Sequence, residues 1–296
     1  MDVLFLILNY KTYNETILLT KELLSSTTIL KYKILIVDND SPNESFEIIK
    51  DAFKEEIRVE VVSSGENGGY AKGNNFGMRY AKKYSPKYVC IINNDVHFSF
   101  RTIESLCVWY EKLPNVAFIA PKQKLPNGED VIFKMMDVPT LKKDINLYNP
   151  FSNKKHYYVE NTTIEGVCRI GIIPGAFIFT SYSLFERLGF FDESTFLFCE
   201  ERFIAKKAEI AGLCNYIILN ETYLHNHSTT ISSEASEKRQ RKMIFDGRCL
   251  YHKKYSSHPV LAVLLLKIVF NYNEFVYSIA RRINYLIKGK KSQIMV

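Results

Sequence analysis

Residues 88–95 read YVCIINND, an apolar run that stops abruptly at three polar residues. An unbroken apolar run is typical of a strand in a parallel sheet, because both faces of such a sheet are covered by helices. Shorter or similar runs occur earlier in the chain, at residues 3–8 (VLFLIL), 32–37 (YKILIV) and 59–62 (VEVV). These four runs predict four strands of one sheet.

The segments between these runs have the residue spacing of helices, which we expect at residues 15–26, 45–53 and 74–84. Alternation of strand and helix indicates an α/β fold with a Rossmann-like, mostly parallel central sheet flanked by helices. In such sheets, ligands bind beyond the carboxyl ends of the strands. The polar clusters at these ends are Asn9-Tyr10, Asp38-Asn39-Asp40 and Asn93-Asn94-Asp95.

The pattern is less regular beyond residue 95. Further helices are expected at residues 102–113, 183–188 and 200–211, and strands at 116–120, 167–173, 176–180 and 216–219. The polar, lysine-rich segment 124–165 is expected to be irregular. We predict one large domain over residues 1–255, which could bury a sizeable core, followed by a helical tail over residues 256–296.

The net charge of +7 is concentrated in one part of the chain. Residues 253–296 contain eight basic residues and one acidic residue, so this segment carries the entire excess. A nucleic-acid-binding protein spreads basic groups over a binding face with aromatic residues between them, so we expect no nucleic-acid partner. A basic segment beside apolar residues indicates contact with an anionic membrane surface instead.

The tail also has the spacing of an amphipathic helix. Residues 260–266 are wholly apolar, and apolar residues then recur every three or four positions, with Arg281 and Arg282 between them. Such a helix lies in a membrane interface. The alternative is an ordinary pair of packed helices. No stretch reaches the roughly 18–20 apolar residues of a spanning helix, so we expect a peripheral contact.

The cysteines and the N-terminus both indicate a cytoplasmic protein. None of the six cysteines forms a CxxC pair, and no histidine stands at zinc-site spacing from them, so reduced thiols are expected. The opening MDVLFLILNY lacks the basic region and the cleavage site of a signal peptide. It is more typical of a buried first strand, and we expect the protein at the inner face of the cell membrane.

Two acidic residues and one loop in the first half are candidates for ligand binding. Asp95, at the end of a strand, could hold Mg²⁺ or Mn²⁺, or could instead form an Asx turn. Asp38 could accept hydrogen bonds from a base or ribose, or again be a turn residue. Residues 67–75 (NGGYAKGNN) open a helix, where N–H groups could face phosphate, but they match neither common phosphate-loop motif.

Three candidate groups stand in the second half. Glu200 and Glu201 begin a helix and point about 100° apart, so one could face a cleft as a general base. The alternative is a favourable charge at a helix N-terminus. His225 and His227 share one face of an extended segment, as metal or phosphate contacts or as structural residues. Arg248 could neutralise a leaving diphosphate, or lie on a solvated basic helix face.

Taken together and in order, these segments resemble glycosyltransferase family 2, especially its bacterial rhamnosyltransferase-like branch. The resemblance extends over residues 2–255. The segments that carry it are ILNY (7–10), IVDNDS (36–41), ENGGYAKGNNFG (66–77), INNDV (92–96), PGAF (174–177), LGFFDESTFLFCEER (188–202) and LHNHS (224–228). It implies a GT-A fold, a nucleoside-diphosphate sugar donor, Mg²⁺ or Mn²⁺, and transfer with inversion.

The resemblance also implies roles for individual residues. Asp38 is expected to contact the nucleotide, with Tyr10 near the base. Asp95 matches the metal-binding end of the family's DxD motif, and His225 matches a late histidine near the metal and the diphosphate. The residues expected to line the donor site are Asn67, Gly73, Asn74 and Asn94.

The glutamate pair matches the family's Glu-Asp motif, in which the second acid is the usual general base. We therefore expect Glu201 to be the base, with Glu200 as the alternative. The sequence departs from the family pattern at two positions. Asn93 replaces the first acid of the DxD motif, and Glu201 replaces an aspartate, which lengthens the base by one carbon.

The sequence thus predicts a metal-dependent hexosyl- or rhamnosyltransferase. Its expected acceptor is a glycan or a lipid-linked oligosaccharide, in the synthesis of a bacterial cell-surface polysaccharide such as a capsule. One alternative is a non-catalytic nucleotide-sugar or glycan-binding protein of the same fold, which Asn93 and Glu201 keep open. A second is a nucleotidyltransferase, which would need a basic, glycine-rich triphosphate loop that residues 9–12 do not supply.

Overall fold

The computed structural model describes residues 1–130, 137–149, 164–226 and 237–293, with side chains in the last helix described as far as Ile279. The chain forms two compact units. The first comprises Met1–Val138 and Tyr157–Ile244, and the second comprises Pro139–His156 and Phe245–Val296. The boundary expected from the sequence, between residues 255 and 256, falls inside the second unit.

The first unit is built on a nine-stranded sheet of order β3-β2-β1-β4-β8-β6-β9-β5, with β7 paired to β9. Its first four strands are β1 (Val3–Asn9), β2 (Tyr32–Asp38), β3 (Val59–Ser63) and β4 (Tyr88–Asn93). These strands are parallel. The four apolar runs therefore form the predicted strands, and β1 is a buried first strand.

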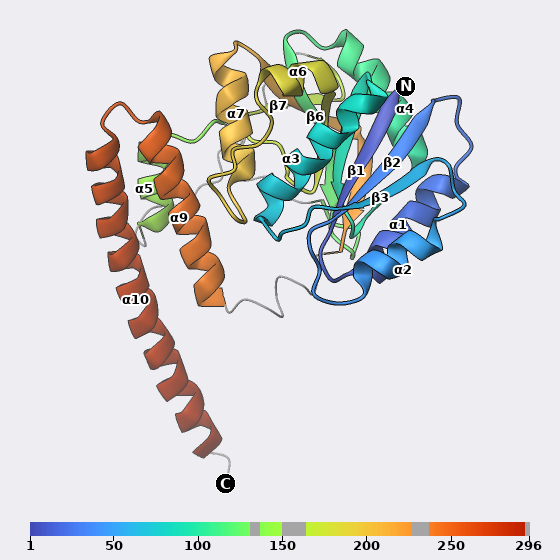
Figure 1. Cartoon of the computed structure of the whole chain (residues 1–296). Coiled ribbons are helices and arrows are strands. Elements are labelled where there is room, and N and C mark those ends of the chain that lie inside the picture. Colours follow the sequence, from blue (N-terminus) through green and yellow to red (C-terminus); the bar gives the residue numbers. More distant parts are fainter. Residues whose placement is uncertain (131–136, 150–163, 227–236, 294–296) are drawn as a thin grey trace. The chain divides into compact units, whose positions relative to one another are not determined.

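Three helices connect the parallel strands: α1 (Tyr13–Ser25), α2 (Ser45–Ala52) and α3 (Gly69–Ala81). In Figure 1, α1 and α2 cover one face of this part of the sheet and α3 covers the other. The connections change direction between β1 and β4, where an open α/β sheet forms its ligand crevice. The start expected for α3, at residue 74, is wrong, because the helix begins at Gly69.

The second half of the sheet is mixed. It contains β5 (Val96–Phe98), β6 (Val116–Lys124), β7 (Val167–Ile170), β8 (Phe177–Ser181) and β9 (Cys214–His225). Strand β8 is antiparallel to both β4 and β6, whereas β6 and β9 are parallel. Strands β5 and β7 both pair antiparallel with β9. The sheet is therefore parallel on one side and mixed on the other.

Three further α-helices described in the first unit are α4 (Phe100–Lys112), α6 (Tyr182–Arg187) and α7 (Glu200–Ile210), all close to their predicted bounds. The expectation of irregular structure throughout residues 124–165 is wrong in one part, because α5 (Leu141–Tyr148) is a helix. A threonine at its N-cap, Thr140, accepts a hydrogen bond from the N–H of Lys143.

The second unit contains α5, α10 (Pro259–Gln293), and the part of α9 (Glu237–Tyr255) that follows Ile244. Its core is small and aromatic: Phe245 of α9 stacks on Phe270 of α10, with ring centroids 4.0 Å apart. Leu266 is fully buried beside them. Ala262, Leu266 and Phe270 of α10 are buried, whereas Leu261, Leu264 and Ile268 are exposed.

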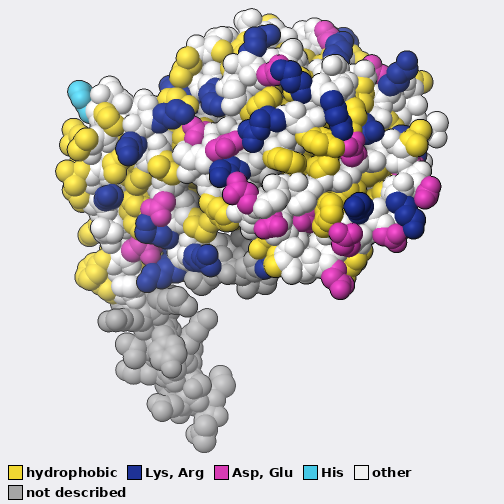
Figure 2. Space-filling model, in the orientation of Figure 1, with side chains coloured by type: hydrophobic (Ala, Val, Ile, Leu, Met, Phe, Trp, Pro, Cys, Tyr) yellow, Lys and Arg dark blue, Asp and Glu magenta, His cyan; other side chains and the backbone are white. Residues whose placement is uncertain are grey.

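Helix α10 changes one expectation. Residues Pro259–Ile279 are long and apolar enough to cross a membrane, with a mean hydropathy of 1.5 over the best 18-residue window, of which 17% is buried. The expectation that no stretch has this character is wrong for that segment. An average over 18 residues tolerates the isolated Lys267 and Asn271, whereas an unbroken apolar run does not. Figure 2 shows apolar side chains along this helix.

Candidate active site

Asp38 lies at the carboxyl end of β2, where its carboxylate organises the following loop. The Asn9 amide donates to Asp38 Oδ2 over 2.7 Å, and the backbone N–H of Ser41 donates to Oδ1 over 2.8 Å. The Ser41 hydroxyl also donates to Oδ2 over 2.8 Å. The carboxylate is buried. Tyr10 is only half-buried at the adjacent end of β1, so the predicted nucleotide contacts share one end of the sheet.

Asn94 lies in the turn after β4 and faces the start of α1. Its amide donates to Thr12 Oγ1 over 2.7 Å and to Thr16 Oγ1 over 2.9 Å. These bonds fix the turn at the point where the strand order reverses. Its amide nitrogen thus has protein partners, and its role toward a donor stays a prediction.

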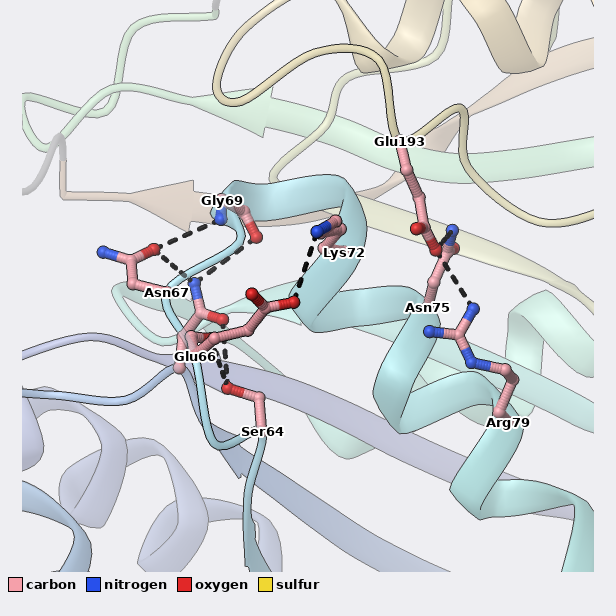
Figure 3. A network of polar contacts seen from close by, with 9 residues as sticks. Ser64, Glu66, Asn67, Gly69, Lys72, Asn75, Arg79 and Glu193 are labelled. Atoms are coloured by element: carbon pink, nitrogen blue, oxygen red, sulfur yellow. Dashed lines mark hydrogen bonds and ion pairs between the residues drawn. The ribbon is translucent and has the colours of Figure 1, made fainter.

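The loop before α3 forms a network with the loop after β2 (Figure 3). Asn67 Oδ1 accepts hydrogen bonds from the Asn39 amide over 3.0 Å and from the backbone N–H of Gly69 over 3.2 Å. Gly73 lies so close to β1 and β2 that a Cβ there would meet Leu8 at 2.6 Å and Asn39 at 2.8 Å. Both predicted donor-site residues therefore contact or closely approach Asn39, in the loop after β2.

Asn74 is fully buried one residue further along α3. Its amide donates to the Tyr70 carbonyl over 2.9 Å. Its Oδ1 has no hydrogen-bond partner within the described residues. A buried polar atom without a partner is uncommon in folded proteins, so this carbonyl oxygen is an unsatisfied acceptor within α3.

Asp95 and His225 meet across the pairing of β5 with β9. In that pairing, Val96 is the partner of His225, which places the preceding Asp95 beside the imidazole. Nε2 of His225 lies 3.3 Å from Oδ1 of Asp95, and both side chains are largely buried. The structure thus joins the two residues expected to hold a cation.

Two buried side chains that the sequence did not single out stand behind this pair. Gln123 of β6 lies with its Nε2 3.3 Å from Nδ1 of His225. The Tyr223 hydroxyl donates to Oε1 of Gln123 over 3.0 Å. Burial, with a smaller contribution from the Asp95 charge, raises the pKa of Tyr223. Its hydroxyl therefore stays protonated as a donor.

Glu200 and Glu201 begin α7 but lie in different surroundings. Glu200 is buried, and its Oε1 accepts a hydrogen bond from Thr195 over 3.1 Å. Burial first, and the charge of Glu201 second, raise the pKa of Glu200 to about 8. Burial also raises the pKa of Glu201, whose side chain remains half-buried.

Glu201 is held against the loop between β7 and β8. A Cβ on Gly175 would lie 2.1 Å from Oε1 of Glu201, so a larger residue there would displace this carboxylate. The Tyr70 hydroxyl donates to the Gly175 carbonyl over 2.8 Å. Burial raises the pKa of Tyr70, and the charges of Glu201, Glu200 and Tyr223 add to this effect. The charges that act on Tyr70 thus come both from the glutamate pair and from Tyr223.

The backbone before the glutamates is in an uncommon conformation. Phe198 and Cys199, the latter capping α7, have φ angles of 72° and 75°. Such angles cost non-glycine residues about 1 kcal/mol or more each and are found most often at functional sites. The preceding loop is fixed to α3: Asn75 donates to Glu193 over 2.9 Å and to the Phe191 carbonyl over 3.0 Å. Figure 3 shows the contacts of Glu193.

The roles expected for His227 and Arg248 stay predictions. His227 lies outside the described residues. Arg248 belongs to the second unit, where its guanidinium stands 4.9 Å from the Tyr148 ring and its Nε lies 3.9 Å from Asp144. In the described part of the chain, no group of three or more histidine, cysteine or acidic side chains could hold a metal.

Three residues of the site were not named as candidates from the sequence. Tyr70 stands inside the quoted glycine-rich segment, so its position carried a signal. Gln123 and Tyr223 carried none, because an isolated polar or aromatic residue in a strand is ordinary. Only the pairing of β6 with β9, in which Gln123 is the partner of Tyr223, brings them to His225.

Residues 9–176 match the family model for glycosyl transferase family 2. The chain belongs to glycosyl transferase family 2. The matched segment runs from the end of β1 to the loop that holds Glu201, and so includes Asp38, Asn67 and Asp95 but neither the glutamate pair nor His225.

A curated relative of this family 2 chain is the low-salt glycan biosynthesis hexosyltransferase Agl10 of Haloferax volcanii. The two are 26% identical over 203 residues, which cover 68% of this chain and 59% of the relative. The chain therefore spans about three fifths of the length of that protein.

Solved structures show the same fold. TarS of S. aureus (residues 1–349, with UDP-GlcNAc) has a TM-score of 0.56 at 13% identity, over 94% of this chain and 73% of that chain. The mannosyltransferase PcManGT of Pyrobaculum calidifontis, with GDP-Man and Mn²⁺, has a TM-score of 0.55 at 11% identity, over 95% and 80%. The predicted GT-A-type α/β fold is confirmed.

Proposed function

We propose that this family 2 protein is an inverting hexosyl- or rhamnosyltransferase that uses a nucleoside-diphosphate sugar. The observation that carries the proposal is the contact of Asp95 with His225, 3.3 Å apart, together with the raised pKa of Glu200 and of Glu201 at the start of α7. Solved structures of the same fold bind UDP-GlcNAc or GDP-Man. These complexes support a nucleotide-sugar donor here.

Asp95 and His225 fit a divalent cation by chemistry and spacing. Two ligands on neighbouring positions of an octahedral Mg²⁺ or Mn²⁺ ion stand roughly 3 Å apart, and Oδ1 and Nε2 are separated by 3.3 Å. The pair supplies two ligands, and donor phosphates and water would complete the set. A bound cation would stabilise the negative charge of the departing diphosphate. Without the acid that Asn93 replaces, Asp95 is the only carboxylate of the motif.

Glu201 is the proposed general base. It is the less buried member of the pair and lies against the Gly175 loop, whereas Glu200 is buried and bonded to Thr195. A carboxylate with a raised pKa accepts a proton more readily near neutral pH. Glu201 would take the proton of an acceptor hydroxyl as that oxygen attacks the anomeric carbon, which inverts in one displacement. Glu200 would act on Glu201 through the electrostatic repulsion between the two carboxylates.

The proposed acceptor is a glycan or a lipid-linked oligosaccharide in the synthesis of a bacterial cell-surface polysaccharide such as a capsule. The Haloferax relative is named for glycan biosynthesis, which supports this class of product. The proposed location is cytoplasmic, as a peripheral protein on the inner face of the cell membrane.

The membrane contact rests on the two faces of α10. Ala262, Leu266 and Phe270 are buried in the second unit. A second apolar row, on the other side of the helix, is exposed and follows helical spacing: Leu261, Leu264, Ile268, Phe275 and Ile279. The packed face argues for a helix that lies along the membrane surface, because a spanning helix would present apolar side chains on all sides. The basic residues of 253–296 complement anionic lipid.

A donor panel tests the catalytic proposal. Purified full-length protein is incubated with UDP-, GDP- and dTDP-sugars, with and without Mn²⁺, and stability and donor hydrolysis are measured. Donor binding should raise the melting temperature by mass action. Hydrolysis should be lost in Asp95→Ala and strongly reduced in Glu201→Gln. A wild type that binds a donor without turnover, even with added glycan acceptors, would favour the non-catalytic binding protein.

A further inference from the structure

Strand β9 brings residues from three strands to one place. Gln123 of β6 is the register partner of Tyr223, and Val96 of β5 is the register partner of His225. Tyr223 and His225 stand two residues apart on β9, so their side chains share one face of the sheet. The three strands therefore converge on the imidazole of His225.

The contacts form an unbroken chain of polar atoms. The Tyr223 hydroxyl donates to Gln123 Oε1 over 3.0 Å, and Gln123 Nε2 stands 3.3 Å from Nδ1 of His225. At the other side of the ring, Nε2 stands 3.3 Å from Oδ1 of Asp95. Tyr223, Gln123 and Asp95 are 1%, 6% and 5% exposed, so bulk water competes little for these contacts.

The Gln123 amide has two ends with opposite chemistry. Its nitrogen can only donate and its oxygen can only accept. With Nε2 of Gln123 toward the ring, Nδ1 of His225 must accept, and the neutral imidazole then carries its proton on Nε2, the atom that faces Asp95. A nitrogen that carries a proton has no lone pair for a cation.

We propose that Gln123 is a positioning residue that selects the tautomer of His225. In the orientation shown, it holds the ring with its proton on Nε2. With the amide turned over, Oε1 faces the ring and accepts a proton from Nδ1, and Nε2 offers its lone pair toward Asp95. One proton leaves Nε2 to water and one from water joins Nδ1, so the ring stays neutral. The inference rests on the proposed role of His225 as a cation ligand.

The first test reads the tautomer directly and needs no metal. Protein with ¹⁵N-labelled histidine is compared by two-bond ¹H–¹⁵N correlation spectra at a pH of about 8.5, where a free imidazole is neutral. His225→Gln identifies the signals. Wild type should show the proton on Nε2. Gln123→Glu, whose carboxylate only accepts, should move it to Nδ1, and Gln123→Met should give a mixture. The same tautomer in all three proteins would overturn the inference.

The second test measures Mn²⁺ alone by electron paramagnetic resonance. Gln123→Met, with its mixture of tautomers, should bind Mn²⁺ about 10–100-fold more weakly than Gln123→Glu, as is usual when a residue behind a metal ligand is lost. Gln123→Glu should bind at least as tightly as wild type. Lys124→Gln makes the same change in charge at the next residue of β6 and serves as the control for electrostatics. It should leave the affinity closer to wild type than Gln123→Glu does.

The outcomes separate this inference from the proposed function. If wild type binds no Mn²⁺ but the tautomer still shifts in Gln123→Glu, the metal site of the proposed function fails and tautomer selection stands. If Asp95→Ala abolishes Mn²⁺ binding while Gln123→Met binds as tightly as Gln123→Glu, tautomer selection does not control the site and the inference is overturned. Circular dichroism of each variant checks the fold.

Discussion

Nε2 of His225 lies 3.3 Å from Oδ1 of Asp95, across the antiparallel pairing of β5 with β9. Neither residue is informative alone. Asp95 lies in the turn after the buried strand β4, and His225 is the last residue of the long strand β9. Their proximity follows from the three-residue strand β5, which pairs with β9 only in the folded protein. This proximity brings together a carboxylate and an imidazole that can bind the same ligand.

Replacing Asp95 by asparagine should abolish most of the transfer activity. The change keeps the shape of the side chain but removes the charge, and the loss of one such stabilising group typically costs about 10²–10³ in kcat. The exposed Asp40→Asn is the matched control and should retain activity. A steady-state assay with saturating Mn²⁺ measures both. Equal activities of the two variants would remove Asp95 from the proposed site.

Gly175→Ala should reduce kcat by at least about tenfold, because the new Cβ would occupy the place of the Glu201 carboxylate. In a Glu201→Gln background, the same change should have a much smaller effect, because the displaced group is no longer a base. This double-mutant cycle isolates the coupling between the two residues. Strictly additive losses would show that Gly175 acts independently of Glu201.

Glu200→Gln should make the stability of the protein less dependent on pH. The pKa of Glu200 is raised from 4.5 to about 8 in the folded protein. Between these values, the folded state binds more protons than the unfolded state. Its contribution to the free energy of unfolding is therefore fully present below pH 4.5 and is lost as the pH rises toward 8.

The comparison is made by urea unfolding at pH 5 and pH 8. From pH 5 to pH 8, the free energy of unfolding of Glu200→Gln should rise relative to that of wild type by about 1–4 kcal/mol. Glu66→Gln, in the exposed loop before α3, is the control and should follow wild type. A constant difference between Glu200→Gln and wild type would contradict the raised pKa.

Asn67→Ala should raise KM for the donor several-fold with little change in kcat. The side chain joins Asn39 to the start of α3, so its loss should affect ground-state binding. Glu66→Ala removes only the exposed ion pair with Lys72. That control should leave KM unchanged, and a fall in kcat alone for Asn67→Ala would argue against a binding role.

Leu264→Asn together with Ile268→Asn should release the protein from anionic vesicles. These side chains are 52% and 56% exposed on α10, and each buried apolar side chain contributes roughly 1–3 kcal/mol to such binding. Ile29→Asn with Ile57→Asn, at exposed sites of the first unit, is the matched control. Flotation with phosphatidylglycerol and with phosphatidylcholine vesicles measures both pairs. Carbonate extraction of cell membranes should also release wild type, whereas a spanning helix would resist it.

The amino-acid sequence determined the parallel half of the fold and the Asp38, Asn67 and glutamate candidates. Buried parallel strands are apolar along their whole length, and the polar residues that end them must meet at one edge of the sheet. These are local patterns, and each is complete within a few residues. The bounds of β1, β2 and β4 followed from the sequence for this reason.

The tertiary structure decided the mixed half of the sheet, the full extent of β9, and which side chains contact His225. A three-residue strand such as β5 and an isolated Gln123 have no local signal, because each is stabilised by residues distant in the chain. The same holds for α10, whose spacing shows two apolar faces but not which one packs. Burial of Leu266 and Phe270 settles that choice, because only the folded chain assigns a partner to each apolar face.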